Sequence, residues 1–456
     1  MAGIGFELSK ILKEKNLSAL LRAYGYSMAI AAGPWIISIV SILVAGRVSR
    51  PFIKDPAQIT QFQVAVTYLI AFSLIFTGQF QLYFTRYVAD RMFEKDFKRV
   101  LPNTLGLILF IIASFAVFLY PVFIYAFRGL SPVFSLFFIM TLGLMGSIWI
   151  LNTLLTGIKD YKYIAFSFLA AYLVIILGSY ALAHTGLRGL MLAFFTGQAL
   201  LFFMLLGAVI YHYPSDRLVE FDFLKRSRFY PMLMATGFIY NLAIWVDKFI
   251  FWFHPETGDR VLGPLNNSLI YDLPIFLSYL AIAPGMSIMF LRLETDFVDA
   301  YDDYFGAVTS GDNLRRIYNR NSELAGAARL MLIEVLRVQA VVTIAIFLAS
   351  DLIFDFFGFP KIYQPLFYID LIGTQAQLFF VSVLSLLFYL NRQKETLFLV
   401  SLLLALNTAL SYLSIYLGPF FHGYGFTVSF IVAGLLGIIA LNRHMTRITY
   451  ETFMFN

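Results

Sequence analysis

Six Asp and Lys side chains of this 456-residue sequence lie inside long apolar stretches, where charge is rare. All six fall in the second half of the chain: Asp247, Lys248, Asp272, Asp351, Asp355 and Asp370. A charged side chain in an apolar span is costly unless it is paired or faces water, so these residues are candidates for a translocation path. At about 1.5 Å per helical residue, the five carboxylates come near the same end of their spans. The pattern predicts an acidic vestibule, and the alternative interpretation is a set of hydrated helix ends.

Asp247 and Asp272 are expected to lie close together in this vestibule. Their spans are joined by the short loop 254–263, and elements that follow each other along the chain usually pack as neighbours. Two ionised carboxylates at close range repel each other unless a cation lies nearby. Lys248 is the nearest cation in the sequence and is therefore expected to pair with Asp272 or with a carboxylate of a neighbouring span.

Aromatic residues and prolines within the apolar stretches add two further signals. Tryptophan can stack on a sugar ring, and the mid-span tryptophans Trp35, Trp149 and Trp245 are candidates to line a lumen. A proline in a spanning helix frees a backbone carbonyl and permits a kink, which is tolerated beside a cavity or a neighbouring helix. Helix breaks are therefore predicted at Pro34, Pro274 and Pro284.

Several kinds of chemistry are excluded by what the sequence lacks. It contains no cysteine, so it has no disulfide and no thiolate chemistry. Its five histidines are scattered and form no ligand pair at helical spacing, so no metal site is expected. It has no GxxxxGK[ST] motif to cradle nucleotide phosphates, and no cofactor is expected.

Composition places these residues in a membrane. The sequence is 60% hydrophobic and 13% charged, whereas an average soluble domain is about 25% charged. A spanning helix needs about 20 apolar residues, and about twelve runs reach that length. Their expected bounds are 24–46, 62–85, 101–127, 131–156, 163–184, 189–212, 229–253, 264–291, 335–357, 364–391, 395–418 and 424–442. The sequence thus predicts an all-α protein of the cytoplasmic (inner) membrane that crosses it many times.

The distribution of basic residues predicts the orientation of these spans. With the N-terminus in the cytoplasm, 25 of the 33 Lys and Arg residues fall on the cytoplasmic side and 7 on the outer side, and Lys248 lies in a span. This is the bias of the positive-inside rule, so both termini are expected in the cytoplasm. The net charge of +6 follows from this bias and does not indicate binding to nucleic acid.

The spans divide evenly into an N-terminal lobe (1–220) and a C-terminal lobe (221–456). Each lobe would hold six spans, and residues 1–15 are expected to form an interfacial helix. The one long hydrophilic segment, 292–334, is expected to be a cytoplasmic helical insert whose second half continues into the ninth span. Three arginines of this insert are predicted to hold a partner protein: Arg315, Arg316 and Arg320.

Five segments in order resemble the PelG family, the membrane transporters of the Pel exopolysaccharide system. They are MAGIGFEL with LLRAYGYSMAIAAGPWIISI, FTRYVADRMFEKDF (84–97), GSIWILNTLLTGIKDYKYI (146–164), GFIYNLAIWVDKFIFW (237–252) and YDLPIFLSYLAIAPGMSIMFLRLETDFVDAYDDYF (271–305). The resemblance implies two six-helix bundles facing a central cavity, the fold of the multidrug/oligosaccharidyl-lipid/polysaccharide (MOP) exporter superfamily. It also implies a PelF-like glycosyltransferase, a PelD-like cyclic-di-GMP receptor and a PelE-like protein as partners.

This resemblance implies that the protein is no enzyme and exports a partly deacetylated N-acetylhexosamine polymer for a biofilm matrix. The first alternative is a lipid-linked oligosaccharide flippase or an ion-coupled drug exporter of the same superfamily, in which Asp247 or Asp272 could bind the coupling ion. The second is a membrane glycosyltransferase. Short outer loops argue against that enzyme, because no external domain is available for the chemistry, and no catalytic residue is identified.

Overall fold

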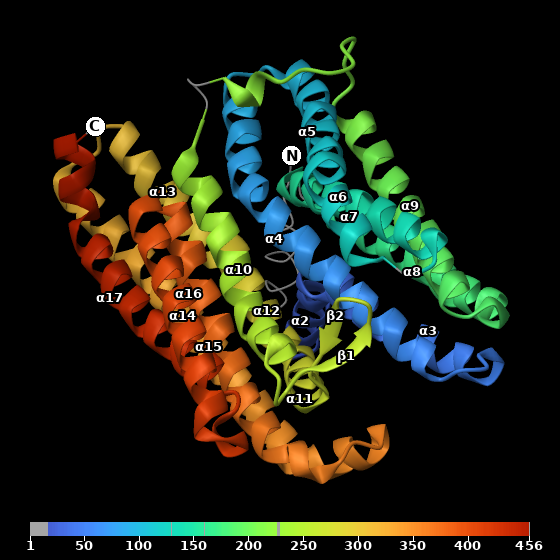
Figure 1. Ribbon diagram of the computed structural model, residues 1–456. Helices are drawn as coiled ribbons and strands as arrows, with labels where there is room; N and C mark the ends of the chain where they lie inside the picture. Colours follow the sequence, from blue (N-terminus) through green and yellow to red (C-terminus); the bar gives the residue numbers. More distant parts are fainter. Residues whose placement is uncertain (1–16, 129, 159, 226–228, 456) are drawn as a thin grey trace. The chain divides into compact units, whose positions relative to one another are not determined.

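The computed structural model describes residues 17–128, 130–158, 160–225 and 229–455, and most of them are helical (Figure 1). Helices satisfy their own backbone hydrogen bonds, as segments that cross a bilayer must. Among the described residues, eleven helices are long and apolar enough to span a membrane, and the bent pair Leu269–Leu280 and Ala283–Thr309 makes a twelfth. The predicted fold class, an all-α membrane protein with about twelve spans, is confirmed.

The chain packs into two compact units. The N-unit comprises Pro34–Leu269, and the C-unit comprises Ile270–Asn456 together with the chain up to Gly33. The sequence placed a lobe boundary near residue 220, which falls inside the N-unit. The assignment of 1–220 and 221–456 to two transport lobes stays a prediction.

The N-unit consists of helices and one small hairpin. Its elements are α3 (Gly33–Ser49), α4 (Ala57–Phe93), α5 (Val100–Ser114), α6 (Tyr120–Ala126), α7 (Pro132–Ile158), α8 (Tyr161–Leu182), α9 (Leu187–His212), α10 (Pro231–Phe253), β1 (Asp259–Leu262) and β2 (Leu265–Asn267). A π-helical turn at Phe115–Leu119 joins α5 to α6. α4 is the central helix, because α7 and α10 both pack along it.

The C-unit is built from the remaining helices. They are α2 (Leu17–Ala31), α11 (Leu269–Leu280), α12 (Ala283–Arg292), α13 (Val298–Thr309), α14 (Leu314–Phe357), α15 (Gln364–Tyr389), α16 (Gln393–Leu417) and α17 (Tyr424–Phe455). α17 packs against α15 and α16, and α12 packs against α2 and α14. The first span is thus divided, because α2 belongs to the C-unit and α3 to the N-unit.

Two glycines let α10 lie directly on α4. A Cβ atom on Gly237 would come 2.0 Å from the carbonyl oxygen of Gly78, and one on Gly78 would come 2.6 Å from that of Gly237. The backbones touch at this crossing, and any side chain there would force them apart. The close fit explains why the seventh span packs with the first half of the chain.

Residues 220–225, which follow α9, are fastened to the start of α5. The side-chain oxygen of Asn103 accepts the backbone N–H of Asp222 at 2.7 Å, and the Asp222 carboxylate pairs with Arg99 and Lys225. Burial raises the pKa of Asp222, but the hydrogen bonds and charges of Lys225 and Arg99 outweigh it and hold the pKa below its usual range. Residues 220–225 are therefore a fixed part of the N-unit.

A β-hairpin replaces the simple loop expected after α10. β1 pairs antiparallel with β2, and the turn is made by Gly263 at φ +56°. Leu262 and Leu265 are buried, and the Tyr68 hydroxyl donates to the Asn266 carbonyl at 3.0 Å. The eighth span therefore begins at Leu269 rather than at residue 264.

The hydrophilic segment 292–334 is helical except for the turn at residues 310–313. α13 is followed by α14, which starts where the Asn313 side chain accepts the N–H of Arg316 at 2.9 Å. α14 then runs for 44 residues without interruption, so the second half of this segment and the ninth apolar stretch form one helix. The assignment of 292–334 as a cytoplasmic insert stays a prediction. The predicted interfacial helix at residues 1–15 lies outside the described residues.

Candidate functional site

The two charged residues of α10 form a buried ion pair within the N-unit. Asp247 is fully buried and Lys248 is 4% exposed. The Lys248 ammonium lies 2.9 Å from Asp247 Oδ2 and donates to the Ile244 carbonyl at 3.0 Å. The sequence suggested a partner on another span, whereas this contact joins neighbours on one helix. A buried charge is tolerated when it is paired and hydrogen-bonded, and this pair satisfies both conditions.

Asp351 and Asp355 lie at the end of α14 and are strongly exposed. Their side chains are 69% and 64% exposed, and Lys361 lies 3.4 Å from both carboxylates. Gln364 also donates to Asp351 at 2.8 Å. This exposure agrees with the alternative interpretation, in which the two residues belong to a hydrated helix end.

Asp370 has a different environment from Asp351 and Asp355, although all three belong to the C-unit. It is fully buried in α15, where α17 packs. A Cβ atom on Gly423 (φ +82°) would come 2.7 Å from Asp370 Oδ1, so this close approach requires glycine. Asp272 is half-buried in the first turn of α11. The vestibule and the pairing of Asp272 with Asp247, which lie in different units, stay predictions.

The prolines and tryptophans selected from the sequence are placed as follows. α2 ends at Ala31 and α3 starts at Gly33, so Pro34 is the second residue of a new helix. Pro284 occupies the same position in α12, where the chain bends by 42°, whereas α11 continues through Pro274. Trp35 is half-buried, and the Trp245 ring lies 6.2 Å from that of Trp252.

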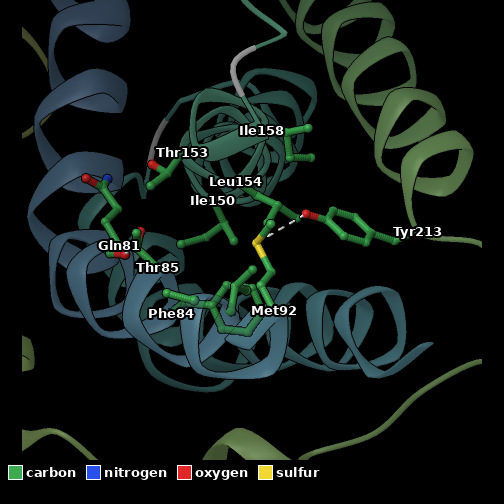
Figure 2. A pocket seen from close by; sticks show the side chains of 12 residues that line it. Gln81, Phe84, Thr85, Met92, Ile150, Thr153, Leu154, Ile158 and Tyr213 are labelled. Atoms are coloured by element: carbon green, nitrogen blue, oxygen red, sulfur yellow. Dashed lines mark hydrogen bonds between the residues drawn. The ribbon is translucent and has the colours of Figure 1, made fainter. Parts of the chain in front are cut away.

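A cavity of about 210 Å³ lies between α4 and α7 within the N-unit. Figure 2 shows Phe84 and Met92 of α4 facing Ile150 and Leu154 of α7, with Tyr213 at one side. Gln81, Thr85 and Thr153 gather at the opposite side. The lining residues are Gln81, Phe84, Thr85, Val88, Ala89, Met92, Ile150, Thr153, Leu154, Gly157, Ile158 and Tyr213.

Among the described residues, those that line the cavity carry no charged side chain, and their polar side-chain groups are an amide and three hydroxyls. Gln81 and Thr85 are four residues apart on α4, as are Thr153 and Gly157 on α7, so each pair shares one helix face. Burial raises the pKa of the Tyr213 hydroxyl, which therefore stays protonated and neutral. Such a wall can hydrogen-bond to an uncharged ligand but offers no counter-ion.

Sequence reasoning did not identify this cavity, because charge was used as the marker of function. Neutral polar residues in a span do not stand out from residues that pack. A signal was nevertheless present, since all lining residues except Gln81 and Tyr213 fall within 84–97 and 146–164, two segments that carry the family resemblance.

The three arginines predicted to hold a partner lie at the start of α14. Arg315 and Arg316 are exposed, and Arg320 is half-buried. Two of them already contact acidic groups: Arg316 lies 3.2 Å from Asp312, and Arg320 lies 3.1 Å from Asp303. Their role in docking stays a prediction.

The fold is similar to that of solved membrane transporters of the MOP superfamily. A MOP superfamily transporter from Pyrococcus furiosus is similar with a TM-score of 0.64 and 11% identity, over 94% of this chain and 96% of that one. An outward-facing multidrug resistance MATE family transporter is similar with a TM-score of 0.65 and 12% identity, over 93% of this chain and 96% of that one. An inward-facing MATE family transporter is similar with a TM-score of 0.61 and 10% identity, over 91% of this chain and 96% of that one. At these identities the likeness concerns the fold alone.

The family is given by the sequence. Residues 1–453 match the PelG family, described as "Putative exopolysaccharide Exporter (EPS-E)", and the chain belongs to this family. No curated protein gives a significant match. Family and fold are those of a multi-pass membrane transporter and not of an enzyme.

Proposed function

We propose that this chain is the export subunit for a Pel-type exopolysaccharide, a partly deacetylated N-acetylhexosamine polymer of biofilm matrix. The match to an exopolysaccharide exporter family over residues 1–453 carries the proposal. The transporter fold supports it, and so does the neutral cavity between α4 and α7, because a sugar ring needs hydrogen bonds rather than a counter-charge.

The partners belong to the same proposal. A PelF-like glycosyltransferase would make the polymer in the cytoplasm, and PelD-like and PelE-like membrane proteins would complete the assembly. The start of α14, with exposed Arg315 and Arg316, is the proposed docking surface for the glycosyltransferase. Exposed arginines suit this role because the guanidinium group binds carboxylates of a partner in a defined geometry.

The second candidate is a lipid-linked oligosaccharide flippase or ion-coupled drug exporter. The buried carboxylate Asp370 favours it, because a coupling ion or proton needs an acidic group in the core of a unit. The cavity favours the polysaccharide, because a cationic drug would find no carboxylate on its wall.

Gene deletion and complementation test the proposal. Deleting the gene should abolish secreted polymer while the glycosyltransferase remains at its parental level, and the full chain supplied in trans should restore secretion. Undiminished secretion after deletion would contradict the proposed function. Loss of drug resistance with undiminished polymer would favour the second candidate.

A further inference from the structure

We propose that the cavity between α4 and α7 binds one uncharged N-acetylhexosamine ring of the polymer as it passes. This inference rests on the proposed function and names the residues that contact the sugar. Gln81 and Thr85 of α4 and Thr153 of α7 form its hydrogen-bonding side, and Phe84, Met92 and Tyr213 form its apolar side.

The hydrogen-bonding side has unused capacity. The Thr85 hydroxyl donates to the Gln81 carbonyl at 2.7 Å, and the Thr153 hydroxyl donates to the Trp149 carbonyl at 2.8 Å. Each hydroxyl donates only one hydrogen, so both oxygens remain able to accept from a sugar hydroxyl. The Gln81 amide makes one long contact, 3.4 Å to Thr77 Oγ1, and has a second N–H and a carbonyl oxygen to offer.

The opposite side suits the C–H face of a sugar ring. Phe84 and Met92 lie one above the other along α4 and point into the cavity, and Tyr213 lies beside Met92, its hydroxyl 3.7 Å from the methionine sulfur (Figure 2). The aromatic and thioether groups can contact the ring face while the polar side meets its hydroxyl and acetamido groups. A small-molecule site usually has an apolar wall with a few polar groups, as this cavity does.

Size and charge select among possible occupants. Drug-sized ligands occupy pockets of about 300–1,000 Å³, whereas this cavity measures about 210 Å³, which suits a single ring. A cation would lose its hydration without gaining a counter-ion, so an ammonium group is disfavoured. An acyl chain would offer no hydrogen-bond partner to the second N–H and the carbonyl oxygen of the Gln81 side chain.

The position of the cavity fits an entry step. It lies at the ends of α4 and α7 that the distribution of Lys and Arg places toward the cytoplasm. Gly157 and Thr85 line the cavity and are exposed, so a ligand can reach it from outside the unit. A ring arriving from a cytoplasmic enzyme would meet this site before the middle of the membrane.

Gly157 allows the cavity to be filled without disturbing the packing. A Cβ atom there meets no atom within 4 Å, and the same holds for the exposed Gly207 of α9, which does not line the cavity and serves as the matched control. Gly157→Trp should reduce secretion at least tenfold at parental protein level, and Gly207→Trp should secrete as the parent does. Parental secretion by Gly157→Trp would overturn the subsite. Failure of the parental chain itself to restore secretion would instead overturn the proposed function.

A binding measurement decides the subsite independently of secretion. The chain has no cysteine, so Gly157→Cys and Gly207→Cys each give one background-free site for maleimide labelling of the purified full chain. An oligosaccharide of N-acetylhexosamine should slow labelling at residue 157 at least fivefold and leave residue 207 unchanged. If phospholipid slows labelling at residue 157 and the oligosaccharide does not, the cavity is a lipid site and the inference is wrong.

Discussion

Variants of the buried ion pair on α10 can show whether Asp247 and Lys248 contribute to stability, to transport or to both. Asp247→Asn removes the negative charge at constant size and leaves the Lys248 ammonium buried beside an amide. Lys248→Met removes the positive charge and leaves the carboxylate. Breaking a buried pair by removing one partner costs about 3–5 kcal/mol, whereas replacing both partners by neutral groups is often nearly neutral. The double variant Asp247→Asn/Lys248→Met should therefore be close to the parent in stability.

The expected changes in melting temperature follow from the size of the unit. About 1 kcal/mol shifts the midpoint of a domain of this size by about 2–4 °C, so a loss of about 3 kcal/mol corresponds to about 6–12 °C. Tryptophan fluorescence of the detergent-purified chain during heating measures these midpoints. The matched control is Asp355→Asn, which also removes a carboxylate beside a lysine but at a side chain that is 64% exposed, and its midpoint should not move.

Secretion by the same variants then distinguishes a structural role of Asp247 from a role in transport. If the double variant melts like the parent and secretes like it, the pair is structural and the vestibule is wrong for this residue. If the double variant melts like the parent but secretion is lost, the charge of Asp247 acts in transport. Single variants that melt at the parental temperature would refute the reasoning itself, because a buried and paired charge cannot lose its partner without cost.

Three further predictions concern other parts of the chain. Asp222→Asn should lower the melting midpoint at neutral pH. The pKa of Asp222 is lower in the folded than in the unfolded state, so the ionised carboxylate stabilises the fold at pH values above its unfolded pKa of about 3.9. In thermal scans, the difference in melting midpoint between variant and parent should be constant from pH 5 to pH 8. It should shrink below about pH 3.9, as the carboxyl group of the folded protein gains its proton. A reporter active only in the cytoplasm should give signal when fused to the C-terminus, and signal from a periplasmic reporter alone would contradict the predicted orientation. Charge reversal at Arg315, Arg316 and Arg320 should release the glycosyltransferase in co-purification at normal expression, while Arg260→Glu in the hairpin should not, and full recovery with the triple variant would exclude this docking surface.

The number of spans and the helical insert could be predicted because both depend on local properties. A run of apolar residues long enough to cross a bilayer must become a helix, whatever it packs against. The continuity of α14 was equally local, since no proline or glycine pair interrupts residues 314–357. The hairpin between α10 and α11 depends instead on Tyr68, which lies almost 200 residues away in sequence and holds it by a hydrogen bond.

The boundaries of the packing units could not be predicted by counting spans. They depend on the contact of Gly78 with Gly237 and on the anchoring of Asp222 by Asn103, and each of these joins residues more than 100 positions apart. Nothing in the sequence around residue 220 distinguishes a free linker from an anchored one. Only the partner side chains do so, and they lie on α4 and α5.

Charge was a sensitive marker for unusual residues but an ambiguous marker for the path of a polymer that contains uncharged N-acetylhexosamine rings. The structure gives several of the marked residues a local partner that accounts for their charge: Asp247 has Lys248, and Asp351 and Asp355 have Lys361. An uncharged ring of the polymer needs hydrogen bonds rather than a counter-charge, so charge alone does not mark its path. Hydroxyl and amide groups meet this need, since they hydrogen-bond to water when the path is empty and to sugar when it is occupied. The side chains that contact the polymer should therefore be sought among neutral polar residues on exposed helix faces, such as Gln81, Thr85 and Thr153, whose types alone give no signal in the sequence.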